Sequence, residues 1–192
     1  MKETLTQPTT AQLEAEMARV SYRLRFGRVL RSTIYALVIV AAAAVLIATL
    51  WLPILQIYGS SMTPTLEEGE IVVAAKGSRF DTGDVIAFYY NNKMLVKRVI
   101  ASAGQWVNID EDGTVYVDNV KIDEPYLTEK AFGDCDLKLP YQVPDGRLFV
   151  MGDHRATSVD SRNTVVGCVA EEQIVGKIVF CIWPMERLGH VS

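Results

Sequence analysis

The stretch Ile34–Leu52, IYALVIVAAAAVLIATLWL, contains no charged residue. As an α-helix these 19 residues would be about 28 Å long, close to the hydrocarbon thickness of a bilayer. A buried core helix is rarely apolar on every face. A cleavable signal peptide has a shorter apolar region that ends in a small-x-small site, whereas this run ends in Trp51-Leu52-Pro53. The sequence therefore predicts an uncleaved transmembrane anchor.

The charges that flank this anchor predict its orientation. Residues 1–33 hold six Lys and Arg against three Asp and Glu, whereas residues 34–192 hold 13 against 20. After the anchor, no Lys or Arg occurs before Lys76. Because positively charged flanks stay in the cytoplasm, we expect residues 1–33 to be cytoplasmic, residues 34–52 to span the cell membrane and residues 53–192 to be extracytoplasmic. The acidic outer part gives no reason to expect binding to nucleic acid.

Residues 9–31, before the anchor, have the pattern of a basic amphipathic helix. Such a helix lies on the inner membrane surface or stays solvated, and the sequence leaves both open. In either case the lipid bilayer is a partner of the chain.

Residues 53–192 consist of short β-prone runs separated by turn signals. An Asn91-Asn92 turn between two such runs indicates a hairpin, and Asp112-Gly113 and Asp118-Asn119 indicate two further turns. The expected strands include Ile71–Ala75, Val85–Tyr90 and the following run to Val99, Val115–Val117, Leu148–Met151 and Ile174–Ile182. With no long helix expected in this part, the pattern predicts a mainly β domain, a barrel-like or folded sheet.

The three cysteines, Cys135, Cys168 and Cys181, form no CxxC pair and have no histidine cluster nearby. Zinc sites need such spacing, so we expect no metal site. The odd number fits either three buried thiols or one disulfide with a free thiol.

One segment soon after the anchor, Gly59–Leu66, reads GSSMTPTL. Clusters of Ser, Gly and Pro usually mark a turn and nothing more. Ser61, however, is nine residues past Leu52, within about 30 Å of chain from the anchor. A serine hydroxyl needs a base to act as a nucleophile. The chain contains no GxSxG, SxxK or HExxH motif, so the common serine and zinc arrangements are absent.

The candidate base is Lys97, in the β-prone run MLVKRVI. On an ideal strand it shares a face with Leu95 and Val99, and burial on an apolar face lowers the pKa of a lysine. Lowering that pKa from about 10.4 to about 7 costs about 4–5 kcal/mol of stability. A functional role for the lysine would explain why the fold tolerates this loss. The alternative is that the lysine reaches water along its apolar stem.

The third segment is residues 151–162, MGDHRATSVDSR, which is dense in Ser, Asp and Arg. It fits a solvated loop with surface ion pairs. It also fits a scaffold in which Ser158 bonds an amine while an Asp–Arg pair braces the loop.

Together the three segments resemble the type I signal peptidases, membrane-bound leader peptidases that use a Ser–Lys pair. The resemblance covers, in order, the anchor, GSSMTPTL, GDVIAF followed by LVKRVI, and MGDHRATSVDSR, and it is closest in style to the Gram-positive, single-anchor form. It implies that Ser61 is the nucleophile and Lys97 the general base. It also implies that Ser158 orients the lysine amine and that Asp160 and Arg162 hold the site together. The implied fold is a mostly antiparallel β domain with coiled strands.

The chain departs from the family pattern at three places. Gly59 stands where some members carry a serine of the oxyanion hole, which leaves open the donors other than the Ser61 backbone N–H. Residues 101–105 read ASAGQ instead of the usual Gly-x-Pro-Gly-Asp, and His154 and residues 156–157 replace Asn and Asp-Asn. These changes flank the reacting groups, so we expect activity to survive.

The resemblance implies a membrane-bound serine endopeptidase that removes signal peptides from secreted preproteins, cutting after small-x-small sites. Lys97 would take the Ser61 proton, an acyl-enzyme would form, and Lys97 would then activate water, with no metal or cofactor. An extended substrate would add as a strand beside Ile57–Gly59. The residues expected around the substrate pockets are Ile57, Tyr58, Gly59, Met62, Leu66 and Val96, although core packing explains the apolar ones equally well.

Three other classes of protein compete with this interpretation. An anchored β module that binds peptides or partners would give Lys97 no role. A self-cleaving repressor shares Ser–Lys chemistry but needs a DNA-binding or regulatory segment and no membrane helix. A Ser–His hydrolase would depend on His154.

Overall fold

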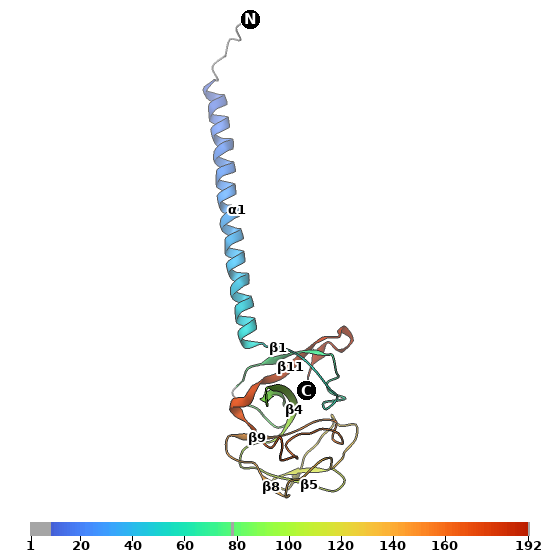
Figure 1. The fold of residues 1–192 in the computed structure, drawn as a ribbon. Coiled ribbons are helices and arrows are strands. Elements are labelled where there is room, and N and C mark those ends of the chain that lie inside the picture. Colours follow the sequence, from blue (N-terminus) through green and yellow to red (C-terminus); the bar gives the residue numbers. More distant parts are fainter. Residues whose placement is uncertain (1–8, 78, 192) are drawn as a thin grey trace. The chain divides into compact units, whose positions relative to one another are not determined.

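The computed structural model describes residues 9–77 and 79–191 (Figure 1). The chain divides into two compact units, residues 1–48 and residues 49–192. In the described residues the first unit is helical, and the regular secondary structure of the second consists mainly of strands joined by loops.

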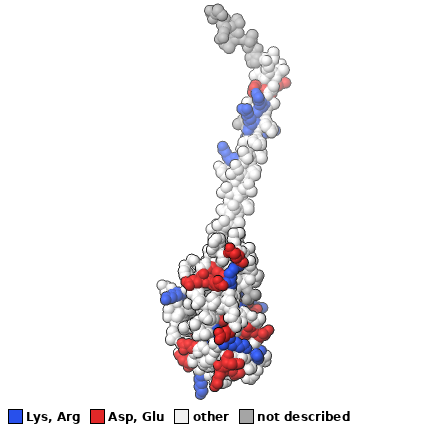
Figure 2. Space-filling view, turned by 90° about the vertical axis from the view of Figure 1, so that its right-hand side faces the viewer, with Lys and Arg blue, Asp and Glu red and all other residues white. Residues whose placement is uncertain are grey.

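Helix α1 runs without a break from Thr10 to Trp51, a length of 42 residues. At 1.5 Å per residue this is about 63 Å, roughly twice the hydrocarbon thickness of a bilayer. Arginines mark its N-terminal half and uncharged residues its C-terminal half (Figure 2). Among the described residues, α1 is the one helix long and apolar enough to cross a membrane. It ends before Pro53, because a residue that precedes proline avoids the α conformation.

The second unit contains two antiparallel sheets. The larger has eight strands in the order β1-β2-β11-β3-β4-β9-β10, with β12 added beside β11. Its strands are β1 (Ile54–Gln56), β2 (Ile71–Ala75), β3 (Val85–Tyr90), β4 (Lys93–Ala101), β9 (Arg147–Met151), β10 (Val169–Ala170), β11 (Ile174–Trp183) and β12 (Gly189–His190). Within the described residues this path ends at β1 and β10, so the sheet is coiled but not a closed barrel.

The smaller sheet has four strands in the order β7-β6-β5-β8. They are β5 (Trp106–Ile109), β6 (Val115–Val117), β7 (Val120–Lys121) and β8 (Tyr141–Gln142). A single apolar cluster joins the two sheets, because Val107 and Val115 of this sheet pack with Ile100 and Phe149 of the larger one. The only helices described in this unit are two short 3₁₀ turns, η1 (Glu171–Gln173) and η2 (Met185–Arg187).

The local sequence explains the central hairpin. Residues of β3, VIAFYY, are β-branched or aromatic apart from one alanine, which favours a strand. Asn91 and Asn92 then adopt positive φ angles of 43° and 62°, the geometry of a tight hairpin turn. This turn pairs β3 with β4 so that Ile86 lies opposite Lys97. The mainly β, antiparallel fold expected from the sequence is confirmed.

Candidate active site

Ser61 lies in the loop between β1 and β2, which we call the nucleophile loop (residues 59–69). Gly59 opens it with a φ of +81°, a left-handed conformation that glycine adopts without strain. The Leu66 N–H donates to the Met62 carbonyl, and both side chains are buried in the apolar core with Val72 of β2. The loop is therefore anchored by its own apolar side chains immediately after Ser61.

Lys97 is in the middle of β4, and only 3% of its surface is exposed. Its amine donates a hydrogen bond to Ser61 Oγ at 2.6 Å. The lysine therefore does not reach water along its stem, which was the alternative left open by the sequence. The structure brings together two residues that are 36 positions apart in the chain.

Burial lowers the pKa of Lys97 from 10.5 to about 8, because the charged amine loses its hydration. The charge of Asp160 raises this pKa, that of Arg162 lowers it, and that of Asp153 raises it, each by less than burial lowers it. No carboxylate in the described residues forms an ion pair with the amine. An amine with a pKa near 8 is available as a base close to neutral pH.

The loop that follows β9, residues 152–163, lies against the nucleophile loop. The His154 N–H donates to the Ser61 carbonyl. Asp160 and Arg162 form a buried, two-point ion pair with both N–O distances at 2.9 Å. Asp160 also accepts a hydrogen bond from the Gly152 N–H at 2.9 Å. The two residues expected to hold the site together therefore do pair with one another.

Ser158 is buried, and its hydroxyl has no hydrogen-bond partner among the described residues. The expected bond from this hydroxyl to the Lys97 amine is therefore not formed in this structure. The hydroxyl packs against Gly152, where an added Cβ would lie 2.2 Å from Ser158 Oγ and 2.5 Å from the Ser61 carbonyl oxygen. Only glycine fits at this position, between Ser158 and the backbone of Ser61.

Two further buried ion pairs were missed by the sequence analysis. Arg98, next to Lys97, binds both oxygens of Asp153 at 2.9 and 2.8 Å and lies 3.8 Å over the ring of Tyr126. Arg155 pairs with Glu124 in the same two-point way. The motif LVKRVI contains Arg98, and MGDHRATSVDSR contains Asp153 and Arg155. Nothing in the spacing of these motifs indicates the partners of the three residues.

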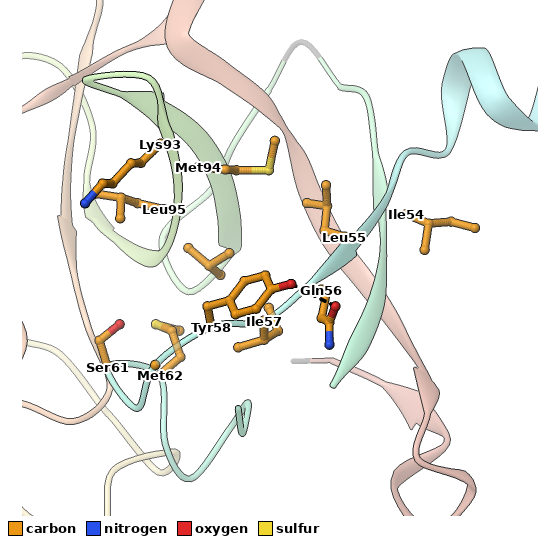
Figure 3. Close-up of a pocket in the computed structure, with 12 residues that line it drawn as sticks. Ile54, Leu55, Gln56, Ile57, Tyr58, Ser61, Met62, Lys93, Met94 and Leu95 are labelled. Carbon is orange, nitrogen blue, oxygen red and sulfur yellow. Dashed lines mark hydrogen bonds between the residues drawn. The ribbon is translucent and has the colours of Figure 1, made fainter. Parts of the chain in front are cut away.

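A groove of about 500 Å³ runs from Ser61 along β1 and the start of β4. Figure 3 shows Ser61 and Ile54 at opposite ends of the labelled residues, with Ile57 and Tyr58 between them and the Tyr58 hydroxyl directed toward Gln56. Of the residues expected to bind substrate, Ile57, Tyr58, Gly59, Met62 and Val96 line the groove. Leu66 does not, which corrects the expectation: it is 0% exposed and packs in the core. The groove is also lined by Ile54, Leu55, Gln56, Lys93, Met94 and Leu95.

Among the described residues, neither the cysteine thiols nor the His154 imidazole forms a hydrogen bond with Ser61 or Lys97. All three cysteines are free thiols, with Cys168 and Cys181 buried and Cys135 half-buried. The disulfide alternative is not formed, and the alternative of three buried thiols fails at Cys135. The His154 imidazole bonds to the Thr157 hydroxyl at 2.8 Å. Among the described residues no group of His, Cys, Asp and Glu has the arrangement of a metal site.

Comparison with known proteins assigns the family. The family of signal peptidases, peptidase S26, matches residues 30–183. The chain is 36% identical over 170 residues to signal peptidase I of Bacillus amyloliquefaciens, covering 82% of this chain and 87% of that protein. It is 38% identical over 154 residues to signal peptidase IB of Staphylococcus aureus, covering 70% of this chain and 79% of that protein.

A solved signal peptidase I from Enterococcus faecalis covers 52% of this chain and 97% of its own, with 28% identity and a TM-score of 0.45. The family match spans most of the chain, and the curated relatives are matched over most of their own length. The chain therefore belongs to the signal peptidase I family (peptidase S26) of serine endopeptidases, which remove signal peptides.

Proposed function

We propose that this protein cleaves signal peptides from secreted preproteins with Ser61 as nucleophile and Lys97 as general base. One observation carries the proposal: a buried amine, with its pKa lowered to about 8, lies 2.6 Å from the Ser61 hydroxyl. A lysine in this environment is costly to the fold and useful to catalysis, since a neutral amine accepts a proton from serine.

The reaction begins when neutral Lys97 takes the Ser61 proton and Ser61 Oγ attacks the scissile carbonyl. The developing oxyanion needs hydrogen-bond donors. The Ser61 backbone N–H suits this role, because it donates to no other acceptor in the described part of the chain. Gly59 has no hydroxyl to add. Lys97 then protonates the leaving amine, and the acyl-enzyme forms.

Hydrolysis repeats the steps with water. Neutral Lys97 takes a proton from a water molecule, which attacks the acyl carbon. The bond between the acyl carbon and Ser61 Oγ then breaks, and Lys97 returns the proton to Ser61 Oγ. Ser158 enters at this stage as a positioning residue: its buried, unpartnered hydroxyl is available to hold the lysine amine. Asp160 and Arg162 brace the same loop through their two-point pair. The steps need no metal or cofactor.

The substrate lies as an extended strand in the groove, beside Ile57–Gly59. Four residues of β4, from Lys93 to Val96, form one wall of the groove. They span about 13 Å of strand, enough for the last four residues before the cut. Alternate residues of a strand face the same wall. The side chains at the last and third-last positions therefore point together toward the wall that contains Met62 and Val96.

We propose the topology in the same way. Residues 34–52 cross the membrane, residues 1–33 stay in the cytoplasm because of their positive charge, and residues 53–192 act outside it. Support comes from α1, whose apolar half is long enough to cross a bilayer, and from membership of a family of membrane proteins. Only nine residues separate Leu52 from Ser61, which keeps the reaction near the membrane surface.

The experiment is cleavage of a model preprotein with an Ala-x-Ala site by the full chain in detergent. We expect wild type to cut after the second alanine, and Ser61→Ala and Lys97→Ala to be folded but inactive. Matched controls are Ser60→Ala, at the adjacent serine, and Lys177→Ala, which removes a lysine paired with Asp84 at the surface. Both controls should keep activity.

Other outcomes would point to the competing classes. An inert wild type, with all variants folded, would favour an anchored binding module. Full activity of Lys97→Ala would refute the Ser–Lys mechanism. Loss of activity in His154→Ala, with Lys97→Ala active, would favour a Ser–His hydrolase.

A further inference from the structure

Arg187, near the C-terminus, contacts the nucleophile loop. It ends η2, which follows β11 and precedes β12. Its Nη2 donates to the carbonyl oxygens of Pro64 and Thr65 at 2.9 and 3.0 Å. Arg187 lies beyond residue 183, where the family match ends. Neither the motifs nor the comparison therefore assigns it a role.

The rest of the guanidinium group is also paired. Nη1 lies 2.5 Å from the exposed Glu67, and Nε lies 2.8 Å from Glu70. Glu70 is 2% exposed, and its carboxylate takes no hydrogen bond from the described residues, so the ion pair with Arg187 compensates its charge. A planar group with several donors in fixed directions can make these contacts at once, which a lysine ammonium cannot.

A second set of hydrogen bonds holds the side chain of Thr65. The Thr65 hydroxyl donates to Asp153 at 2.5 Å and accepts from Arg98 at 3.2 Å. Arg187 therefore fixes the main chain of Pro64 and Thr65, while the Arg98–Asp153 pair fixes the Thr65 side chain. Only two residues lie between Ser61 and Pro64, so displacement of this stretch moves the nucleophile relative to Lys97.

We propose that Arg187 is a positioning residue that holds the nucleophile loop so that Ser61 Oγ stays at hydrogen-bond distance from the Lys97 amine. The inference rests on the proposed function of Ser61 and Lys97. Arg187 touches neither the reacting atoms nor the groove. Its loss should therefore lower kcat and leave KM unchanged.

Replacement of Arg187 by alanine leaves the Glu70 carboxylate buried without its partner, which is destabilising in itself. The informative variant is therefore Arg187→Ala combined with Glu70→Gln, which removes both charges. A matched control is Arg147→Ala, because Arg147 also donates to a backbone carbonyl, that of Cys168 at 2.9 Å, but far from the nucleophile loop along the chain.

The test measures kcat, KM and melting temperature of the full chain in detergent, with an Ala-x-Ala preprotein as substrate. We expect the double variant to lose between about 5- and 50-fold in kcat, the scale of a small misplacement of a reacting group, with KM unchanged. The pH dependence of kcat/KM should keep its midpoint, since Arg187 is not among the groups that shift the pKa of Lys97. Arg147→Ala should keep wild-type kcat at temperatures where it is folded.

Chemical rescue adds a second readout. A cavity of about 380 Å³ lies beside Arg187 and is lined by Pro64, Thr65 and Glu70, so removal of the side chain opens a place for a small planar cation. Guanidinium chloride at low millimolar concentration should raise kcat of the single variant Arg187→Ala, and sodium chloride at equal ionic strength should not.

Two results would overturn the proposal: wild-type kcat in the folded double variant, or a kcat loss no larger than that of Arg147→Ala. These two results differ from those that would refute the proposed function. Failure of the proposed function would appear as an inert wild type or as an active Lys97→Ala variant.

Discussion

The two sides of the Ser61–Lys97 pair differ in chemistry. On one side lies the groove, walled by apolar residues such as Ile57, Met62 and Val96. On the other lies a cluster of buried ion pairs that includes Arg98–Asp153 and Arg162–Asp160. The apolar side removes water from the lysine amine, and the charged side fixes the loop that faces it.

The contrast is sharpest among the buried cations of the described residues. Arg98, Arg155 and Arg162 each bind a carboxylate at two points. Arginine stays charged even when it is buried. Lys97 has a serine hydroxyl as its hydrogen-bond partner. The fold therefore pairs the buried arginines with carboxylates and leaves Lys97, the proposed general base, without an ion-pair partner among the described residues.

The largest effect is expected from removing one partner of the buried Asp160–Arg162 ion pair. Asp160→Asn and Arg162→Met should each cost about 3–5 kcal/mol of stability, because each leaves a buried charge without its partner. Their effects on the pKa of Lys97 should be opposite. Asp160 raises this pKa and Arg162 lowers it, so Asp160→Asn should move the acid limb of kcat/KM to lower pH and Arg162→Met to higher pH.

Melting curves and pH profiles of the two variants measure these effects. Lys177→Met is the control, since its ion pair with Asp84 is partly exposed and should contribute less than about 1 kcal/mol. Acid limbs that move in the same direction would show that the two charges do not act on Lys97 as described.

The next effect concerns the influence of the buried Lys97 on the stability of the protein. A pKa lowered from 10.5 to about 8 corresponds to a destabilisation of about 3 kcal/mol. Lys97→Met removes the buried charge at similar volume, so it should raise the stability at pH 7 by up to about 3 kcal/mol while abolishing cleavage. The unfolded state binds the lysine proton more tightly, so wild type gains stability as pH rises from about 8 to about 10.5.

Melting temperatures of both proteins from pH 7 to pH 10.5 check this prediction. The difference should be full below pH 8 and should shrink as pH approaches the unfolded pKa. A Lys97→Met variant less stable than wild type at pH 7 would show that the amine contributes favourable contacts that outweigh its desolvation.

The third effect is the pH dependence of catalysis itself. In the proposed mechanism only neutral Lys97 accepts the Ser61 proton, so kcat/KM should rise about tenfold per pH unit below the pKa of about 8 and level off above it. Initial rates between pH 5.5 and 9.5 with one preprotein measure the midpoint. A flat profile over this range would mean that a group other than Lys97 limits the reaction.

Local patterns predicted the elements that depend on neighbouring residues. The strands expected over Ile71–Ala75, Val85–Tyr90 and Val115–Val117 have those bounds. The Asn91-Asn92 and Asp118-Asn119 turns show the positive φ angles that their residues tolerate. The strands that were missed, such as β8 and β10, are two residues long, too short for a periodic pattern.

The residues of the candidate site also divide into those that the sequence predicted and those that it did not. The chemistry of their segments made Ser61 and Lys97 candidates, and the resemblance to the family implied their roles. The structure brings the two residues into contact. Glu124 and Arg187 were not named, because their partners are fixed only by the tertiary fold: Glu124 pairs with Arg155, 31 residues away, and Arg187 binds Pro64, 123 residues away. No spacing rule connects residues at such separations.

The smallest effect on stability is expected at Ser158, at the boundary between the two sides. Its buried hydroxyl has no partner, so Ser158→Ala loses no hydrogen bond and should change stability by less than about 1 kcal/mol. If the hydroxyl holds the amine during catalysis, kcat should still fall, by about tenfold for one bond of about 1.4 kcal/mol.

Ser161 provides the matched control, because its buried hydroxyl accepts from the Val150 N–H at 3.0 Å and donates to the Gly167 carbonyl at 2.8 Å. Ser161→Ala should therefore cost about 1–3 kcal/mol and leave kcat unchanged. The two serines, three residues apart, should show opposite patterns. Ser158→Ala should lose rate without losing stability, and Ser161→Ala should lose stability without losing rate. A Ser158→Ala variant with wild-type kcat would remove Ser158 from the mechanism and leave Lys97 positioned by its burial alone.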